Sequence, residues 1–115
     1  MLEHNGKKFV CHIDWGMELV RGKWKSVILC HLSDGPKRFL ELQRITSGVS
    51  QKVLTQKLNE MEQHGLILKK TYPEVPPRVE YELTELGKEL FPALQLLESW
   101  SIKYFDQVTQ ESVKP

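Results

Sequence analysis

The most regular pattern of hydrophobic and polar positions in the chain lies between Ser50 and Gly65. Leu54, Leu58 and Met61 recur at spacings of four and three, which places them on one side of a helix. Ser50 suits the N-cap, because its hydroxyl can accept a hydrogen bond from an unpaired amide of the first turn. Gly65 suits the residue after the helix, because glycine enters the left-handed region without steric cost. The pattern therefore predicts one amphipathic helix between these two residues.

The polar side of this helix carries amides, hydroxyls and one cation, whereas a solvated face is usually dominated by Glu and Lys. Its residues are Lys52, Gln56, Asn59 and Gln63, with Thr55 on the flank. Such groups donate to and accept from base edges in a DNA major groove, and a lysine can bind a phosphate or a guanine. An ordinary solvated face is the commoner explanation for a helix taken alone, so the flanking sequence decides between the two.

Three further helices are expected ahead of this one, at residues 14–20, 23–32 and 39–45, because apolar residues recur at helical spacing within each range. Gly22 separates the first two, and Asp14 is the expected N-cap of the first. A turn rich in Gly and Pro stops the second. The side chains expected to face the core from the second and third helices are Trp24, Val27, Ile28, Leu32, Phe39, Leu42 and Ile45.

The third of these helices is joined to the helix that follows Ser50 by residues 46–49, a short connection that contains glycine. Two helices joined in this way, the second of them capped, are typical of a helix-turn-helix. In that geometry the second helix enters the major groove by its N-terminal end. The residues at that end are Ser50, Gln51, Lys52, Thr55 and Gln56.

Two strands are expected next, at residues 66–71 and 78–83. In the second strand Val79, Tyr81 and Leu83 alternate with polar residues, so they should face the core. The proline-rich segment between the strands is too stiff for a two-residue turn and should project as a wing. These elements together predict an α+β chain of the winged helix-turn-helix class, mainly helical with a two-stranded wing.

Cations flank the tip of this wing, at Lys69, Lys70 and Arg78. A wing of this kind could lie over phosphates or place Arg78 in a minor groove, and such contacts fix position more than they read sequence. The alternative explanation for the two lysines is plain solubility.

Thr84 is the expected cap of a long last helix, in which Pro92 should cause a kink or mark a change of segment. The apolar arc of this helix is wider than one small core would cover. Its members are Leu86, Leu90, Phe91, Ala93, Leu94, Leu96, Leu97, Trp100, Ile102, Tyr104, Phe105 and Val108. Ile13, Trp15 and Met17 add apolar surface from the first helix. We therefore expect a homodimer built from the N- and C-terminal helices; the alternative is a last helix folded back on its own domain.

Length and composition fit one globular domain of 115 residues with a net charge of +1. The polar N-terminus and the lack of a long apolar run predict neither a secretory signal nor a membrane span. The two cysteines lie far apart and form no disulfide framework or metal knuckle, so the expected location is a reducing cytoplasm. We expect residues 1–10 to be a flexible arm, residues 11–108 the domain and residues 109–115 a tail.

Charge is distributed unevenly along the chain. Between residues 36 and 59, cations outnumber the single carboxylate, that of Glu41. From residue 80 onward, carboxylates outnumber cations. The cations of the first segment are Lys37, Arg38, Arg44, Lys52 and Lys57. A basic patch at one end of the molecule is expected of a DNA-binding domain.

Several motifs resemble one known family. The most specific is Pro76-Pro77-Arg78-Val79-Glu80-Tyr81, which leads into Leu83-Thr84 at the start of the last helix. The other matching residues are Cys11, Gly22-Lys23-Trp24, Asp34-Gly35, Arg38-Phe39, Glu41-Leu42, Ser50, Lys52, Leu54-Thr55, Leu58, Gly65-Leu66, Tyr72, Gly87 and Trp100. Over residues 11–100 the chain therefore resembles the HxlR-type family of bacterial winged helix-turn-helix transcription regulators, a branch close to MarR.

The resemblance implies a homodimer that binds a palindromic operator in double-stranded DNA through two recognition helices. For such a dimer the half-sites lie about one turn, ~10 bp, or a multiple of it apart. Lys52, Thr55 and Gln56 match recognition-helix positions of the family, and Arg78 matches its wing. No cofactor is expected. The full set of candidate DNA-binding residues is Arg38, Ser50, Gln51, Lys52, Thr55, Gln56, Lys69 and Arg78.

The resemblance also implies a redox function for Cys11, because several members of the family sense oxidants or electrophiles through a cysteine just before the first helix. The position is physically sensible, since a helix N-terminus favours the thiolate, which is the reactive form. His12 stands where many relatives have proline, which puts the local backbone in question. The alternative is a small buried hydrophobe, and that is the expected state of Cys30, which lies in an apolar pattern.

Other classes of function fit less well. His4, His12, His31 and His64 are scattered without metal-ligand spacing, and there is no Gly-rich phosphate loop or Ser/His/Asp context, so an enzyme is not expected. A metal sensor of the ArsR type would need paired thiols. Two alternatives stay open: a winged-helix module that binds proteins, and a MarR-like regulator that responds to a small molecule.

Overall fold

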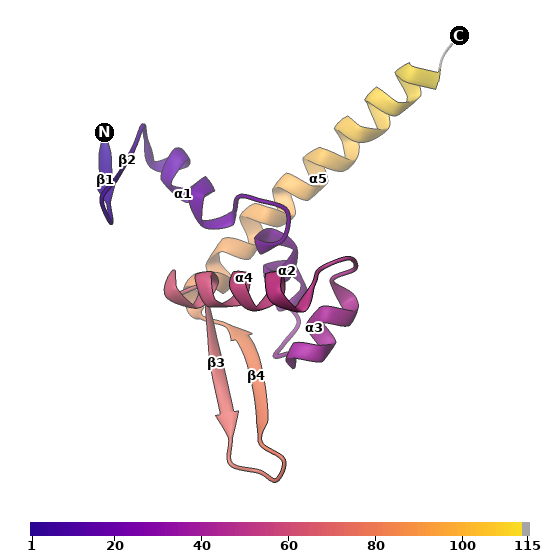
Figure 1. Ribbon diagram of the computed structural model, residues 1–115. Coiled ribbons are helices and arrows are strands. Elements are labelled where there is room, and N and C mark those ends of the chain that lie inside the picture. Colours follow the sequence, from indigo (N-terminus) through magenta and orange to yellow (C-terminus); the bar gives the residue numbers. More distant parts are fainter. Residues whose placement is uncertain (114–115) are drawn as a thin grey trace.

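The computed structural model describes the backbone of residues 1–113 and the side chains of residues 1–110. Five helices and two small antiparallel hairpins make up this part of the chain (Figure 1). In chain order the elements are β1 (Leu2–His4), β2 (Lys7–Phe9), α1 (His12–Val20), α2 (Lys25–His31), α3 (Phe39–Ile45), α4 (Gln51–Gln63), β3 (Ile67–Tyr72), β4 (Arg78–Leu83) and α5 (Glu85–Val113). The expected α+β winged helix-turn-helix is confirmed.

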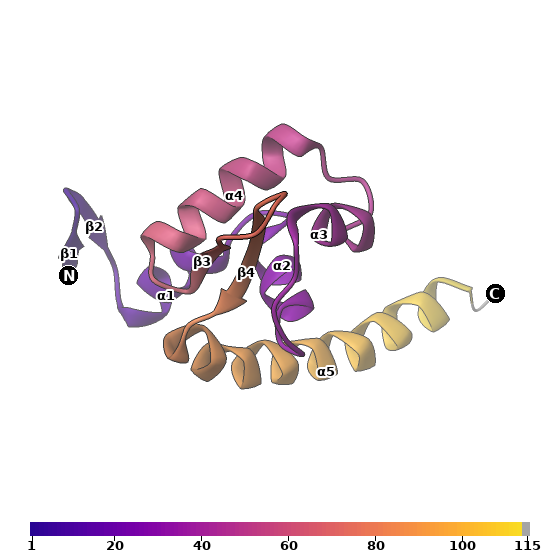
Figure 2. The ribbon, with the colours of Figure 1, turned by 90° about the horizontal axis from the view of Figure 1, so that it is seen from below.

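The hydrophobic core forms where α2 lies between α4 and α5 (Figure 2). The apolar stripe of α4 supplies Leu54, Leu58 and Met61, each no more than 1% exposed. Helix α2 contributes Ile28 and Leu29, which are both fully buried. The remaining core residues are Leu32, Leu42, Val49, Leu66, Ile67, Leu83 and Leu94. The stripe thereby fixes which side of α4 faces outward.

The expected boundaries of α4 are confirmed. The Ser50 hydroxyl accepts a hydrogen bond from the backbone N–H of Val53 at 3.1 Å, as an N-cap should. At the other end Gly65 has a φ of +76°, in the left-handed region that favours glycine.

Strands β3 and β4 pair in antiparallel register from Ile67 opposite Leu83 to Tyr72 opposite Arg78. The segment before α3 adds one rung to this sheet, because Lys37 and Tyr81 exchange two backbone hydrogen bonds of 3.0 and 2.8 Å. The free end of the hairpin projects from the body as a wing (Figure 1). The single rung holds the start of α3 against the base of this wing.

Thr84 connects the residues that follow α4 to the start of α5. Its hydroxyl donates a hydrogen bond to the carbonyl of Gly65 at 2.5 Å and accepts one from the N–H of Gly87 at 3.2 Å. Its own N–H donates to the carbonyl of Leu66 at 3.0 Å. The expected cap of the last helix is confirmed, and the same residue ties that helix to the chain that leaves α4.

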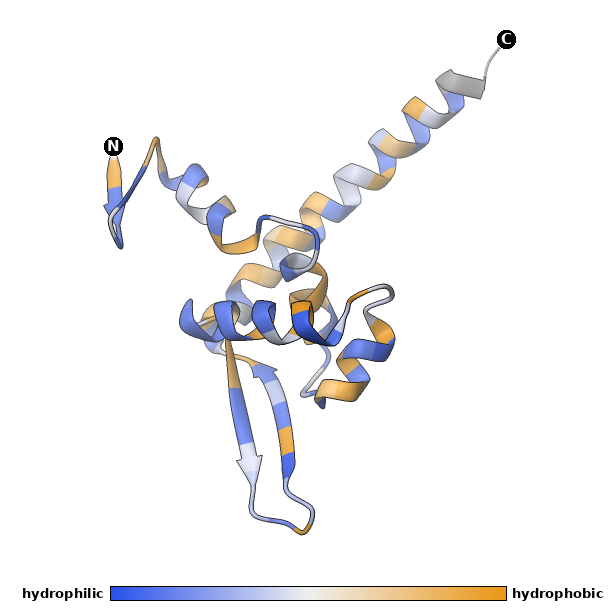
Figure 3. Ribbon diagram, viewed as in Figure 1, coloured by the Kyte–Doolittle hydropathy of each residue, from blue (hydrophilic) through white to orange (hydrophobic). Residues whose placement is uncertain are grey.

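Helix α5 continues through Pro92 as one element, so this proline marks no change of segment. Leu94 is buried against the core. Beyond it α5 runs away from the body and still carries hydrophobic residues (Figure 3). Their large side chains are exposed, with Trp100 at 60% and Phe105 at 65%. Trp100 stacks on Tyr104 with ring centroids 5.3 Å apart.

The N-terminus differs from the flexible arm expected at residues 1–10. Strands β1 and β2 form a hairpin there, with Leu2 opposite Phe9. Asn5 and Gly6 have φ angles of 50° and 77°, as the tight turn of a two-residue hairpin requires. Phe9 is only 7% exposed. The Asn-Gly pair was the sequence signal for this hairpin.

Three smaller expectations were wrong. Helix α1 starts at His12, so Asp14 lies in its first turn, where the carboxylate accepts from the N–H of Val10 at 2.9 Å. Val27 is exposed and Leu29 takes its place in the core, because α2 is rotated relative to the expected stripe. Ile45, in the last turn of α3, is exposed at 38%. Helix α5 includes the backbone of residues 109–113, which belong to the expected tail, and residues 114–115 lie outside the described part.

Candidate nucleic-acid interface

The outward side of α4 places the candidate base-reading residues together at its N-terminal end. Gln51, Lys52, Thr55 and Gln56 are all exposed, and so is the cap Ser50. The Thr55 hydroxyl donates to the carbonyl of Gln51 at 2.9 Å, so its oxygen lone pairs remain available as acceptors. Because the buried stripe holds the opposite side of the helix, these groups are presented on a rigid element. They can donate to and accept from base edges.

Exposed cations lie at this end of α4 and on the α3 segment that precedes it in the chain. Among the described residues, Arg38, Arg44 and Lys52 form no ion pair, so their charges are available to phosphates. Arg38 directly precedes α3, where its backbone N–H donates to the Glu41 carboxylate at 3.1 Å. The basic segment is weaker than the sequence count indicates, because Lys37 pairs with Asp34 at 2.6 Å.

Arg78 is held by three groups of the wing itself. Its guanidinium lies over the ring of Tyr72, 4.0 Å from the centroid. It also pairs with Glu74 at 3.5 Å and with Glu80 at 3.4 Å. Two carboxylates therefore offset the charge that the sequence assigned to DNA, and a phosphate would have to compete with them.

The two wing lysines differ from each other. Lys70 pairs with Glu82 at 2.7 Å across the hairpin, and this hydrogen bond raises the pKa of the lysine. Lys69 is exposed, and within the described residues it has no ion pair. Of the three wing cations, Lys69 is therefore the one whose charge no carboxylate of the wing offsets.

The two cysteines occupy different environments, and both are free thiols. Cys11 is exposed at the N-cap position of α1, and its carbonyl accepts from the N–H of Trp15 at 3.1 Å. The start of α1 lies away from α4 and the wing (Figure 1). Cys30 is half-buried against the core, and burial raises the pKa of its thiol. Its expected place in the core is thus confirmed in part.

One buried charge beside α4 was not predicted from the sequence. Lys25, the first residue of α2, is 7% exposed, and its ammonium pairs with Glu60 of α4 at 2.9 Å. The sequence pattern did not predict the burial of Lys25, because a lysine next to Trp24 is expected at the surface until the packing of α2 on α4 is known.

Metal-binding clusters and membrane-spanning helices are both absent from the described residues. No three His, Cys, Asp or Glu side chains lie together in a way that could hold a metal ion. None of the described helices is both long and apolar enough to cross a membrane.

The fold and the exposed face of α4 define a winged helix-turn-helix protein of the DNA-binding class. The family model described as HxlR-like helix-turn-helix matches residues 19–109. The chain belongs to this family. It is therefore a helix-turn-helix transcriptional regulator, a class that binds DNA, and not an enzyme.

Relatives of known sequence or structure agree with this assignment. The chain is 48% identical over 101 residues to the uncharacterised helix-turn-helix-type transcriptional regulator YkvN of Bacillus subtilis (strain 168), covering 88% of this chain and 86% of YkvN. The reduced form of the redox regulator HypR superposes with a TM-score of 0.82 at 35% identity, over 87% of this chain and 99% of HypR. The reduced form of the regulator YodB from B. subtilis has a TM-score of 0.73 at 34% identity, over 81% and 92%.

Proposed function

We propose that this regulator binds a palindromic operator as a homodimer, with the N-terminal end of α4 in the major groove and the wing on the minor groove or the backbone. The observation that carries the proposal is the face of α4. Its capped N-terminal end presents Lys52, Thr55 and Gln56 to solvent, while the opposite side is locked in the core. Exposed Arg38 and Lys69 supply flanking phosphate contacts.

The homodimer is supported by apolar surface that the single chain leaves exposed. On α5 it includes Leu96, Trp100 and Phe105, and on α1 it includes Ile13 and Met17. Such a surface on two terminal helices is larger than the scattered apolar residues of a monomer. Pairing of these helices with their copies would set the two α4 helices apart by a fixed distance, as two half-sites require.

The operator part is tested with the reduced protein and a duplex from just upstream of its own gene, against a scrambled duplex of equal length at physiological salt. We expect preference for the native duplex. Gln56→Ala should weaken binding by about 1–3 kcal/mol per half-site. Gln63→Ala is the matched control, because it removes the same side chain from the far end of α4. Equal binding of both duplexes, or equal losses in the two variants, would contradict the proposal and favour a winged helix that serves a protein partner.

The dimer part is tested by sedimentation of Trp100→Glu, which places a charge on the exposed apolar side of α5 without touching the core. Gln95→Glu adds the same charge on the polar side. We expect the first variant to be monomeric and the second dimeric at the same concentration. If both the wild type and Trp100→Glu are dimers, α5 does not form the interface.

We further propose that Cys11 is the redox-sensing residue of this regulator. It is exposed at a helix N-terminus, whereas Cys30 is half-buried with a raised pKa. HypR, which has a similar fold, is a redox regulator. A thiol oxidant should change operator binding of the wild type and of Cys30→Ser, but not of Cys11→Ser. An unaltered oxidant response in Cys11→Ser would dispose of this assignment.

A further inference from the structure

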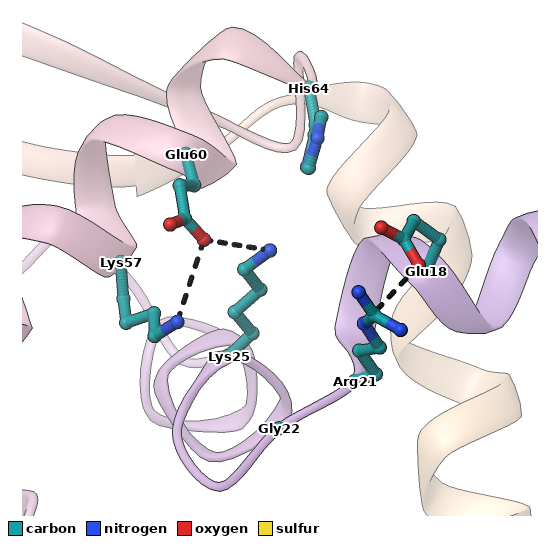
Figure 4. A pocket seen from close by; sticks show the side chains of 7 residues that line it. All are labelled: Glu18, Arg21, Gly22, Lys25, Lys57, Glu60 and His64. Carbon is teal, nitrogen blue, oxygen red and sulfur yellow. Dashed lines mark ion pairs between the residues drawn. The ribbon is translucent and has the colours of Figure 1, made fainter. Parts of the chain in front are cut away.

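A polar cavity of about 420 Å³ lies between the end of α1, the start of α2 and the C-terminal half of α4 (Figure 4). Its charged lining comes from Glu18, Arg21, Lys25, Lys57 and Glu60, and the ring of His64 completes the lining. A volume of this size is within the range of small-molecule sites. It is separate from the outward face of α4 that is proposed to read DNA.

The charges that line the cavity form two clusters on opposite sides of it (Figure 4). On one side the Glu60 carboxylate pairs with Lys25 at 2.9 Å and with Lys57 at 3.6 Å. On the other side the Glu18 carboxylate pairs with Arg21 at 3.2 Å and, from outside the cavity, with Lys7 at 2.9 Å. The lining residues give one positive charge in excess at the Glu60 cluster, and the Glu18 cluster reaches the same excess when Lys7, outside the cavity, is counted.

Two polar groups at the cavity have unused hydrogen-bonding capacity. The ammonium of Lys25 is buried and carries three N–H donors, of which the Glu60 carboxylate takes one. The Nδ1 atom of His64 is buried and has no hydrogen-bond partner among the described residues. Burial, reinforced by the charge of Lys25, lowers the pKa of His64, so its ring is neutral and can donate one hydrogen bond. A ligand oxygen could use these donors.

We propose that this cavity binds a small organic dianion of the dicarboxylate class, one carboxylate at each cluster. Two separated positive excesses match a ligand with a charge at each end better than a compact anion, whose charges cannot reach both sides. Arg21 provides a planar fork for one carboxylate, and Lys25 with Lys57 provides point charges for the other. The ring of His64 lies toward the space between the two clusters (Figure 4).

The site is positioned to influence operator binding, a step that rests on the proposed function. Lys57 and Glu60 belong to α4, and His64 is the residue at its C-cap. A carboxylate that accepts from the free N–H donors of Lys25 shares with Glu60 the ammonium that joins α2 to α4. Ligand binding would therefore alter the contact that holds the recognition helix against the body of the protein.

The site is tested on the full chain without DNA, by calorimetric titration with malonate, succinate and glutarate. We expect saturable binding of at least one of them, about tenfold weaker binding of butyrate, and about tenfold losses in Arg21→Gln and in Lys57→Gln, since each removes one charged hydrogen bond. Lys88→Gln removes an exposed lysine outside the cavity and should bind as the wild type does. The His64 ring resonances should shift with the same titration midpoint.

Three results would overturn the assignment: no saturable binding of any dicarboxylate up to about 10 mM, equal affinity for butyrate, or binding of inorganic phosphate as tight as that of the best dicarboxylate. Coupling is measured afterwards with the operator duplex, where a saturating dicarboxylate should change the affinity of the wild type and not of Arg21→Gln. An unchanged affinity would refute the coupling alone, because the binding measurement does not depend on DNA.

Discussion

The ion pair between Lys25 and Glu60 predicts an asymmetric response to mutation. The Lys25 side chain is 8% exposed and the Glu60 side chain 32%, at a separation of 2.9 Å. Glu60→Ala leaves a buried ammonium without its acceptor, whereas Lys25→Met leaves a carboxylate that solvent reaches and that Lys57 still pairs with at 3.6 Å. The loss of Glu60 should therefore destabilise the protein more than the loss of Lys25.

The magnitudes follow from this difference in exposure. Breaking a fully buried pair costs about 3–5 kcal/mol, but water in the cavity can solvate part of the ammonium. We expect Glu60→Ala to lower the free energy of unfolding by about 2 kcal/mol. Lys25→Met should lower it by about 1 kcal/mol or less, because its methylene stem stays packed. The loss of stability in the double variant should be about 1–2 kcal/mol smaller than the sum of the two single losses.

The assay is urea denaturation at fixed protomer concentration, without added dicarboxylate, because oligomerisation and ligands both shift apparent stability. The loss of unfolding free energy in Lys57→Gln serves as the reference, since that lysine is the more distant partner of the same carboxylate. Equal costs for Glu60→Ala and Lys25→Met, or strict additivity in the double variant, would refute the view that the buried ammonium is the sensitive partner.

Further predictions concern the wing, the joint at α5 and the response to pH. Glu74→Gln frees Arg78 from one carboxylate, so operator affinity should rise roughly threefold to tenfold and the salt dependence should steepen by about one phosphate contact per protomer; Glu85→Gln is the charge-matched control, and an anisotropy titration that finds both variants equal would contradict the idea. In Gly87→Ala the new Cβ would lie 2.3 Å from the backbone carbonyl of Leu66, and we expect a loss of about 2 kcal/mol or more in urea denaturation. His64 has a folded pKa below its ordinary value of 6.5, so the unfolded chain binds more protons and stability should fall as the pH drops from 6.5 towards the lowered folded pKa; His64→Gln should lessen this fall between pH 7.5 and 5.5, and an unchanged pH profile would exclude His64 as its source.

Local signals in the sequence were sufficient for much of the fold. Ser50 and Gly65 define the ends of α4 by their own chemistry, and the stripe through Leu54 and Leu58 defines its buried side, so neither needs knowledge of the tertiary structure. Thr84 was assigned as a cap for the same reason. The N-terminal hairpin was missed because its strands are three residues long and only the turn at Asn5 marks it.

The electrostatic details of the site could not be predicted, because they depend on groups brought together by folding. Arg78 was assigned to DNA as a free cation, yet the register of β3 and β4 places it opposite Tyr72 and beside two carboxylates. Lys25 meets Glu60 only because α2 packs on α4. The sequence shows which charges each element carries, but which of these charges offset each other depends on how the elements pack.

The hydrogen bonds of Thr84 have a mechanical consequence. They fasten the first turn of α5 to the two residues that leave α4, so neither helix can rotate at that point without moving the other. Helix α5 has 29 residues and is therefore about 44 Å long. It acts as a lever whose pivot lies beside the recognition helix: a tilt of about 5° at the pivot corresponds to a displacement of about 4 Å at the far end. In the proposed homodimer, small rearrangements between the protomers along α5 would in this way change the orientation of the helices proposed to read the operator.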